Sequence, residues 1–197
     1  MTVGYTSGLF VTSAVRELRH QHPGADVRTL SLRCDEPRAA LLEHRVDAVV
    51  APLLFPADEL HVTDLYDEPR VLAVPHGHRL AGQESVTLDD IADEPLAQIR
   101  DTDPAWDARW RVNPRPGGRP APGGPVAETL ADKFELIAAG HAAIISAGPH
   151  AIGIRPDLTM IPVEGLEPAH VVVATRTGDR SALVAAFRAC ARAHLAA

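Results

Sequence analysis

The sequence predicts an α/β fold with a mainly parallel sheet, and two observations in its first 51 residues carry this prediction. Short β-prone runs alternate there with segments of helical periodicity, in the order strand, helix, strand, helix, strand. The third run, residues 46–51, is almost wholly apolar, which is typical of a parallel strand buried on both faces. Aromatic residues make up only 4% of the chain, so the core must be aliphatic.

The elements of this first part follow from local signals. Residues 2–6 form the first expected strand, and apolar positions at three- and four-residue spacing then predict a helix that ends before Pro23. The second strand is expected over residues 27–32. An acidic pair followed by proline starts the next helix, over residues 38–45, and residues 46–51 complete the series.

The remaining chain repeats the alternation of strands and helices, with one long interruption. Residues 112–125 hold five prolines and four glycines, so we expect a loop there rather than a domain linker. Thr87 is the expected N-cap of the first helix of this part. The expected helices cover residues 87–91, 103–111, 130–139 and 180–195. The expected strands cover residues 60–65, 70–74, 96–99, 126–127, 142–145, 160–163 and 170–175.

Composition and charge exclude several classes of protein. The net charge of −7 and the scattered basic residues argue against nucleic-acid binding by this chain alone. The N-terminus lacks the features of a signal peptide and no segment is long enough to span a membrane, so we expect a cytoplasmic protein with no membrane contact. Cys34 and Cys190 are expected as reduced thiols, although the sequence alone leaves a single disulfide possible.

Catalytic and metal motifs are missing from the sequence. There is no GxSxG nucleophile elbow, and two HxH pairs (at 20/22 and 76/78) lack acidic or cysteine partners at ligand spacing. The glycine pairs at 117–118 and 123–124 lie among prolines, outside the strand–loop–helix context of a phosphate-binding loop. We therefore expect no catalytic residues, no metal and no cofactor.

Four segments, taken in order, resemble a known family. They are residues 3–7 (VGYTS) with 22–27 (HPGADV), residues 41–50 (LLEHRVDAVV), residues 71–75 (VLAVP) with 78–81 (HRLA), and residues 136–140 (LIAAG). Together they resemble the effector-binding domain of LysR-type transcriptional regulators, over nearly the whole chain. The chain departs from the family pattern at Arg79, Ala142 and Ala147, which affects the expected shape of loops and not the fold.

The resemblance implies the periplasmic-binding-protein type 2 fold, built of two Rossmann-like lobes. Lobe I would comprise residues 1–74 and 166–197 and lobe II residues 75–165, with crossings near Val74–Pro75 and Gly165–His170. It also implies homodimers through such domains, a tetrameric full-length regulator, and DNA binding only through an N-terminal winged helix-turn-helix domain. Met1 directly precedes the first expected strand, so we expect a sensor domain separated from that DNA-binding part.

The position in the fold and the family pattern point to the same ligand site, at the carboxyl ends of the strands in the cleft between the lobes. Arg100 is the expected partner of a carboxylate effector, whereas Asp35 and Glu128 would suit an amine or hydroxyl. The expected pocket residues are Thr6, Ser7, Gly8, Cys34, Asp35 and Leu53 from lobe I, and Ile99, Arg100, Thr102, Glu128, Thr129 and Ser146 from lobe II.

The expected function is therefore effector sensing: a small metabolite bridges the lobes, changes their angle, and alters DNA binding by the intact protein. Two alternatives share the fold. A dehydratase- or deaminase-like enzyme would need a convergent acid, base or nucleophile in the cleft, and a solute-binding protein of a transporter would need export.

Overall fold

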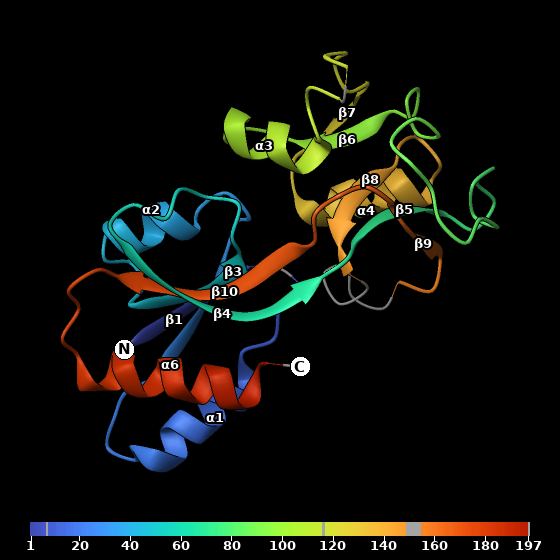
Figure 1. The fold of residues 1–197 in the computed structure, drawn as a ribbon. Coiled ribbons are helices and arrows are strands. Elements are labelled where there is room, and N and C mark those ends of the chain that lie inside the picture. Colours follow the sequence, from blue (N-terminus) through green and yellow to red (C-terminus); the bar gives the residue numbers. More distant parts are fainter. Residues whose placement is uncertain (7, 116, 149–154, 197) are drawn as a thin grey trace. The chain divides into compact units, whose positions relative to one another are not determined.

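The computed structural model describes residues 1–6, 8–115, 117–148 and 155–196 (Figure 1). The chain divides into two compact units. Unit 1 comprises Met1–Glu68 and Ala169–Ala197, and unit 2 comprises Pro69–Pro168. The crossing expected near Val74–Pro75 falls at the end of a strand that belongs wholly to unit 2, because the chain passes between the units earlier, after Glu68.

Unit 1 is built on a five-stranded sheet of order β2-β1-β3-β10-β4. Strand β1 pairs in parallel with both β2 and β3, whereas β10 is antiparallel to β3 and β4. This confirms the predicted strand–helix alternation. The strands are β1 (Thr2–Thr6), β2 (Arg28–Leu32), β3 (Ala48–Pro52), β4 (Leu60–Glu68) and β10 (Ala169–Arg176), and the helices are α1 (Thr12–Gln21), α2 (Pro37–Leu42) and α6 (Ala182–His194).

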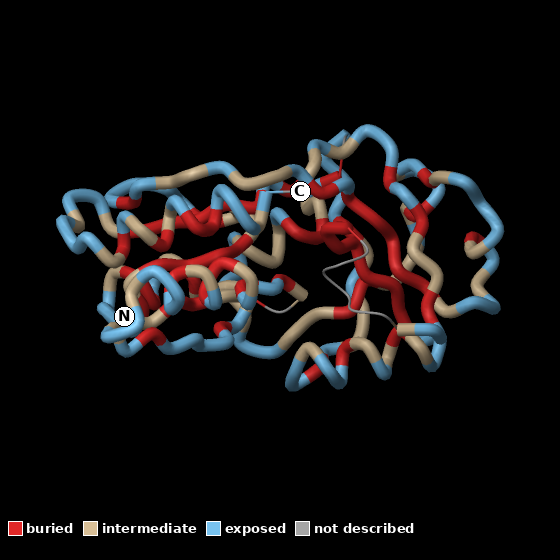
Figure 2. Tube along the Cα trace, turned by 90° about the horizontal axis from the view of Figure 1, so that it is seen from below, coloured by how far each residue is buried: buried red, intermediate tan, exposed pale blue. Residues whose placement is uncertain are grey.

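Helices cover both faces of this sheet, with α1 and α6 on one face and α2 on the other (Figure 1). Successive residues of β3 therefore enter two different apolar clusters, because side chains alternate across a strand. Ala48 and Val50 pack with residues of α1 and α6, whereas Val49 and Ala51 pack with residues of α2. Figure 2 shows buried residues concentrated along the strands. The apolar run predicted for a doubly covered strand is confirmed.

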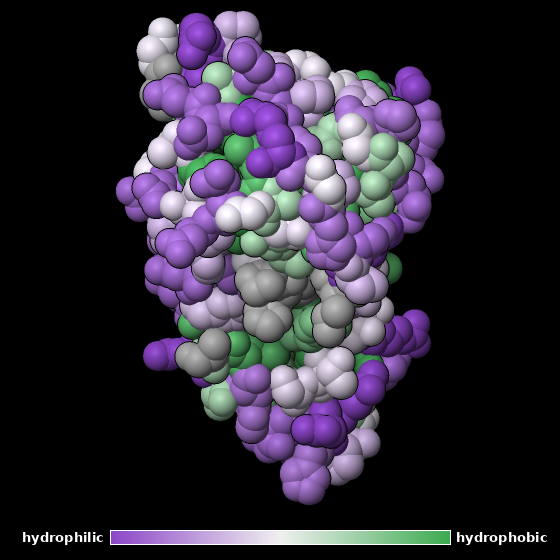
Figure 3. Space-filling model, turned by 90° about the vertical axis from the view of Figure 1, so that its right-hand side faces the viewer, coloured by the Kyte–Doolittle hydropathy of each residue, from purple (hydrophilic) through white to green (hydrophobic). Residues whose placement is uncertain are grey.

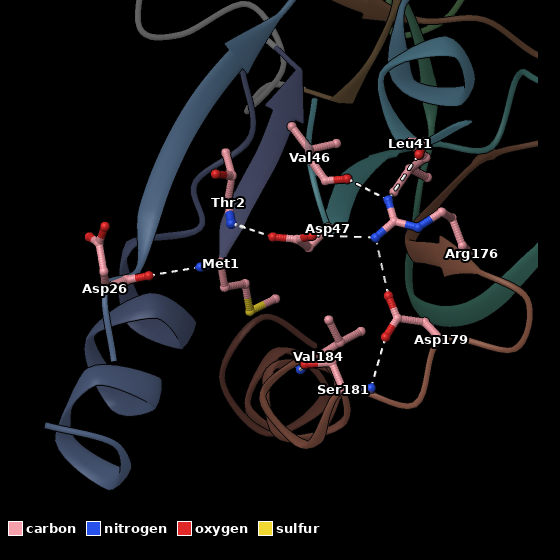
Figure 4. Close-up of polar contacts among 10 residues, drawn as sticks. All are labelled: Met1, Thr2, Asp26, Leu41, Val46, Asp47, Arg176, Asp179, Ser181 and Val184. Atoms are coloured by element: carbon pink, nitrogen blue, oxygen red, sulfur yellow. Dashed lines mark hydrogen bonds and ion pairs between the residues drawn. The ribbon is translucent and has the colours of Figure 1, made fainter. Parts of the chain in front are cut away.

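Arg176, at the end of β10, ties three segments of unit 1 together (Figure 4). Its Nη1 donates to the carbonyl oxygens of Leu41 at 2.9 Å and Val46 at 2.8 Å. Its Nη2 lies 3.3 Å from an oxygen of Asp47 and 3.2 Å from one of Asp179. The end of α2, the start of β3 and the loop before α6 thus share one cation.

Unit 2 contains an antiparallel sheet of order β8-β5-β9 and a parallel pair, β6-β7. A parallel bridge between Leu96 and Ala143 connects β6 to the residue before β8. The strands are β5 (Arg70–Pro75), β6 (Leu96–Ile99), β7 (Gly123–Ala127), β8 (Ile144–Ala147) and β9 (Leu158–Pro162), and the helices are α3 (Pro104–Arg111) and α4 (Leu130–Ala138).

The first residue of β5 anchors helix α3. The Arg70 guanidinium lies 4.6 Å from the ring centroid of Trp110 and donates to the Trp110 carbonyl oxygen at 2.8 Å. Trp106, one helical turn earlier, stacks on Trp110 with 5.5 Å between ring centroids. Both tryptophans of the chain therefore lie in unit 2.

Two predicted elements differ from the structure. The helix expected over residues 87–91 is wrong: the segment forms turns, and Asp90 accepts from Thr87 Oγ1 at 2.7 Å in a cap-like contact with no helix behind it. The loop expected over residues 112–125 ends earlier, because β7 begins at Gly123. A Cβ atom on Gly124 would lie 2.5 Å from the Leu96 carbonyl oxygen, so only glycine allows this close pairing.

Smaller differences concern element ends. Helix α2 ends at Leu42, three residues before the predicted end, and His44 then adopts a left-handed φ of 58°. Strand β8 begins at Ile144, two residues later than predicted. The predicted alternation of β2 does not appear in its burial, because β2 is an edge strand in which only Leu32 is buried.

The face of the molecule shown in Figure 3 is mostly hydrophilic. On the face shown in Figure 3, apolar residues appear only in small groups between hydrophilic ones. Large apolar side chains exposed in the described part of the chain are Phe10, Leu30 and Val126. No helix among the described residues is both long and apolar enough to cross a membrane.

Candidate functional site

In unit 1 the predicted residues lie at one edge of the sheet. Thr6 ends β1 and is in register with Leu32, the last residue of β2, while Leu53 directly follows β3. Since these three strands are parallel, their carboxyl ends meet at the same edge. Cys34 and Asp35 follow β2 by two and three residues, so the structure places them at this edge as well.

Thr6 is the most unusual residue of this edge. Its side chain is 3% exposed, and Oγ1 has no hydrogen-bond partner among the described residues. The Thr6 carbonyl oxygen accepts from the amide of Leu9 at 3.2 Å across Gly8, whose φ is 89°. Ser7 lies outside the described residues. A buried hydroxyl without a partner is costly, which favours a ligand or water as its partner.

The other residues of this edge are already engaged. Asp35 pairs with Arg33, with Nε 3.3 Å from Oδ1, and this hydrogen bond raises the pKa of the guanidinium. Cys34 is half-buried and does not form a disulfide with the buried Cys190. The Leu53 amide donates to the His170 carbonyl oxygen at 2.8 Å. Leu53 can therefore offer a ligand its side chain but not its amide.

In unit 2 the parallel pair β6-β7 brings two predicted residues together. Ile99 is in register with Ala127, and the Arg100 amide donates to the Ala127 carbonyl oxygen at 2.8 Å. The next side chains are Arg100 and Glu128, whose Nε and Oε1 atoms lie 2.6 Å apart. Both side chains remain more than half exposed, so the pair is accessible to a ligand.

A cavity of about 310 Å³ lies beside this ion pair. The turn after β6 forms one wall, because Thr102 Oγ1 donates to the Ile99 carbonyl oxygen at 3.0 Å and Asp101 adopts a left-handed φ of 55°. Half-exposed Val126 adds an apolar surface. The lining residues are Gln98, Ile99, Arg100, Asp101, Thr102, Pro104, Asp107 and Val126.

Three residues that were predicted to bind a ligand line this cavity together, namely Ile99, Arg100 and Thr102. Glu128, also predicted, lies beside the cavity through its ion pair with Arg100. Thr129 and Ser146 do not line this cavity. Thr129 is the N-cap of α4, where its hydroxyl accepts from the Asp132 amide in a capping box. Ser146 is buried in β8 and donates to the Ala147 carbonyl oxygen at 3.3 Å. Contact of either residue with an effector stays a prediction.

Five of the lining residues were not predicted from the sequence, namely Gln98, Asp101, Pro104, Asp107 and Val126. Most of them could have been found, since they flank the predicted end of β6 or lie in the first turn of the predicted helix α3. Val126 could not, because its position depends on which strand pairs with β6.

None of the residues that line the cavity is His, Ser, Cys or Lys, and its polar side chains are those of Gln98, Arg100, Asp101, Thr102 and Asp107. Within the described ranges no group of three or more His, Cys, Asp or Glu side chains could hold a metal ion. The lining instead offers a cation, carboxylates, an amide and a hydroxyl, which suit recognition of a small polar molecule.

A parallel sheet with polar residues at the carboxyl ends of its strands, together with a cavity at such an edge, defines the class of α/β ligand-binding domains. Within that class the chain belongs to the family described as the LysR substrate binding domain, whose model matches residues 2–196. The family resemblance inferred from the sequence is confirmed.

Solved structures agree with this assignment. The effector-binding domain of BenM with its effector benzoate superposes with a TM-score of 0.77 at 19% identity, covering 98% of this chain and 90% of that one. The effector-binding domain of QuiR in complex with shikimate gives 0.78 at 15% identity, covering 98% and 95%. At these identities the likeness concerns the fold, which is the predicted periplasmic-binding-protein type 2 fold.

A curated relative is the HTH-type transcriptional regulator AlsR of Bacillus subtilis (strain 168), 28% identical over 97 residues. The match covers 49% of this chain and 32% of that regulator. The chain thus matches only about a third of the length of this relative.

Proposed function

We propose that the chain is the effector-sensing domain of a LysR-type transcriptional regulator and that the cavity beside Arg100 and Glu128 contacts the effector. The observation that carries this proposal is the exposed Arg100–Glu128 pair at the rim of a 310 Å³ cavity, at the carboxyl ends of two parallel strands. The similar domains of BenM and QuiR bind benzoate and shikimate, and both of these ligands are small molecules with a carboxyl group.

The effector is a small polar molecule that competes with the ion pair. Arg100 offers a planar fork that matches a carboxylate, and Glu128 offers acceptors for an amine or hydroxyl. Because the pair is exposed, an approaching group can take one partner at little cost. The buried Thr6 hydroxyl at the unit 1 edge is a separate candidate contact for a polar ligand.

The effector leaves the domain chemically unchanged in this proposal. Regulation follows when the effector binds two states of the intact protein with different affinity, which shifts their populations. We propose further that the intact protein is a homodimer or tetramer and binds DNA through an N-terminal domain, as the family resemblance implies. The name of the relative AlsR, an HTH-type transcriptional regulator, supports the DNA-binding part of this proposal.

Thermal unfolding with a library of carboxylates, amines and polyols tests the proposal. A true effector raises the midpoint of unfolding, and Arg100→Gln and Glu128→Gln identify the charge that it recognises. A carboxylate effector loses about tenfold or more in affinity with Arg100→Gln, as expected for a charged hydrogen bond. An amine loses affinity with Glu128→Gln instead. The matched control is Arg180→Gln, an exposed arginine of unit 1 outside the cavity.

The contribution of unit 1 is tested by Thr6→Val, which removes the hydroxyl and keeps the shape. We expect about fivefold weaker binding, equivalent to about 1 kcal/mol for one hydrogen bond. The exposed Thr29→Val on β2 is the control. Equal effector affinity in wild type, Arg100→Gln and Glu128→Gln would refute the role of the cavity. Mass spectrometry showing conversion of the bound compound would refute the non-enzymatic role.

A further inference from the structure

A second arginine of unit 2 lies in an environment that the proposed function does not explain. Arg115 is 6% exposed, and its Nε, Nη1 and Nη2 atoms find no hydrogen-bond partner among the described residues. Buried cations in proteins are almost always paired, because an isolated buried charge loses its hydration without compensation. The guanidinium therefore has no hydrogen-bonded negative partner in the described part of the chain.

The neighbouring Arg111 adds a second positive charge near Arg115, which makes a negatively charged partner more favourable. Arg111 has partners of its own: Nη1 lies 3.1 Å from Asp107, and Nη2 donates to the Pro122 carbonyl oxygen at 2.6 Å. Burial, followed by the positive charge of Arg111, lowers the pKa of Arg115. A guanidinium nevertheless keeps its proton in a protein. The two guanidinium groups thus lie near each other, and among the described residues only that of Arg111 is paired with a carboxylate, Asp107.

A cavity of about 280 Å³ adjoins Arg115. Arg119 lines it too, since the Arg115 amide donates to the Arg119 carbonyl oxygen at 2.8 Å and closes a turn that carries both arginines. The remaining lining residues are Leu88, Asp89, Ala92, Asp93, Pro120 and Pro122. No residue is shared with the cavity beside Arg100.

We propose that this cavity is a second binding site, for a small oxyanion whose carboxylate or phosphate group pairs with Arg115 and is held also by Arg119. The planar guanidinium matches either group with two parallel hydrogen bonds. The volume of about 280 Å³ is slightly below the usual range for ligand pockets, which fits a small molecule and not a cofactor. Asp89 and Asp93 repel a second negative group, so the preferred ligand carries one anionic group.

Binding requires a local change of the arginine. The three guanidinium nitrogens are shielded from solvent, so the Arg115 side chain turns toward the cavity when the anion enters. The turn that carries it contains Gly117 and Gly118 with φ values of 86° and 81°, and neither glycine has an atom within 4 Å of an added Cβ.

The test uses the intact chain, with inorganic phosphate and acetate as separate probes at constant ionic strength. Tryptophan fluorescence follows the thermal unfolding of unit 2, because both tryptophans lie there. We expect at least one probe to raise the unfolding midpoint. Stabilisation by phosphate alone, by acetate alone or by both identifies the group that the site accepts, and stabilisation by neither overturns the proposal.

Substitutions locate the effect. Arg115→Gln is expected to weaken probe binding about tenfold or more, and Arg119→Gln to weaken it less. Arg180→Gln removes the same charge in unit 1, away from either cavity, and should leave probe binding unchanged. Equal loss in all three variants would indicate a general effect of net charge and overturn the site.

The stability of the variant without added anion separates a ligand site from an internal ion pair. Removing a buried cation that lacks a partner should leave the unfolding midpoint of Arg115→Gln equal to or above that of wild type. If instead Arg115→Gln, Asp89→Asn and Asp93→Asn all lower the midpoint strongly, Arg115 pairs with those carboxylates in solution, and the proposal fails.

Discussion

Replacing Arg176 by Met should destabilise unit 1 more than any substitution of a surface arginine. The side chain is 16% exposed and donates to two backbone carbonyl oxygens, those of Leu41 and Val46. It also lies within 3.3 Å of Asp47 and Asp179. Methionine fills similar space but offers no donor, so the loss is that of the polar contacts.

The loss of stability in Arg176→Met depends on how well the former partners of the guanidinium are satisfied without it. Asp47 keeps a hydrogen bond from the Thr2 amide at 2.7 Å and is partly exposed, so water can replace the lost contact. Asp179 is only 14% exposed and loses its cation, and the two carbonyls lose a charged donor. Breaking a buried ion pair of this kind costs about 3–5 kcal/mol. Arg176→Lys keeps the charge but not the fork, and we expect it to lose about 2 kcal/mol.

Urea unfolding followed by far-UV circular dichroism measures this loss. With a slope of about 2 kcal/mol per molar urea, the unfolding midpoint of unit 1 should fall by about 2 M. Arg45→Met is the matched control, since Arg45 is 39% exposed and pairs with two glutamates at the surface. Its cost should stay below about 1 kcal/mol. A loss below about 1 kcal/mol in Arg176→Met would refute the reasoning.

Three further predictions concern single positions. Gly124→Ala should weaken the β6-β7 pair by about 1–3 kcal/mol, because the added Cβ would lie 2.5 Å from the Leu96 carbonyl oxygen, and chemical denaturation with tryptophan fluorescence measures this. Thr129→Ala removes the N-cap of α4 and should cost about 1 kcal/mol in the same assay. Burial raises the pKa of Tyr66 to about 12 from the ordinary 10, so the unfolded chain loses this proton first and stability falls as the pH rises from 10 toward 12.

Each of these predictions has a control. Gly123→Ala adds the same atom one residue earlier, where nothing lies within 4 Å, and should be tolerated; equal losses at both glycines would contradict the steric argument. Thr129→Ser keeps the cap and should recover most of the stability. Ultraviolet titration should lose a component near pH 12 in Tyr66→Phe, and an unchanged titration curve would contradict the assignment.

The alternation of strands and helices in the first 51 residues could be predicted because its signals are local. The apolar run of β3 and the proline-started helix α2 give their type without knowledge of neighbours, and parallel pairing then places Thr6 and Leu53 at one edge. The prediction of a helix at Thr87 was wrong because the local signal there fits two structures. A threonine followed three residues later by an aspartate closes a turn as well as it caps a helix, and only packing decides between them.

The composition of the site depended on contacts that no local pattern contains. Arg100 and Glu128 were each expected to bind, but as opposite choices for the effector's charge. The structure pairs them because Gly124 lets β7 approach β6 closely enough to align the two strand ends. Arg115 was overlooked because it lies in a proline- and glycine-rich segment that predicts only a loop, and its burial depends on the tertiary fold.

Unit 1 is formed by two segments of the chain that are separated in sequence by unit 2. This arrangement sets the order in which the two units can fold during synthesis. Strand β10 lies between β3 and β4, so β4 has no hydrogen-bonded neighbour in its sheet until the ribosome has released residues 169–176. Unit 2 is continuous in sequence and is complete before then. A chain truncated after Pro168 and released from the ribosome should therefore hold a protease-resistant unit 2 and a protease-sensitive N-terminal segment.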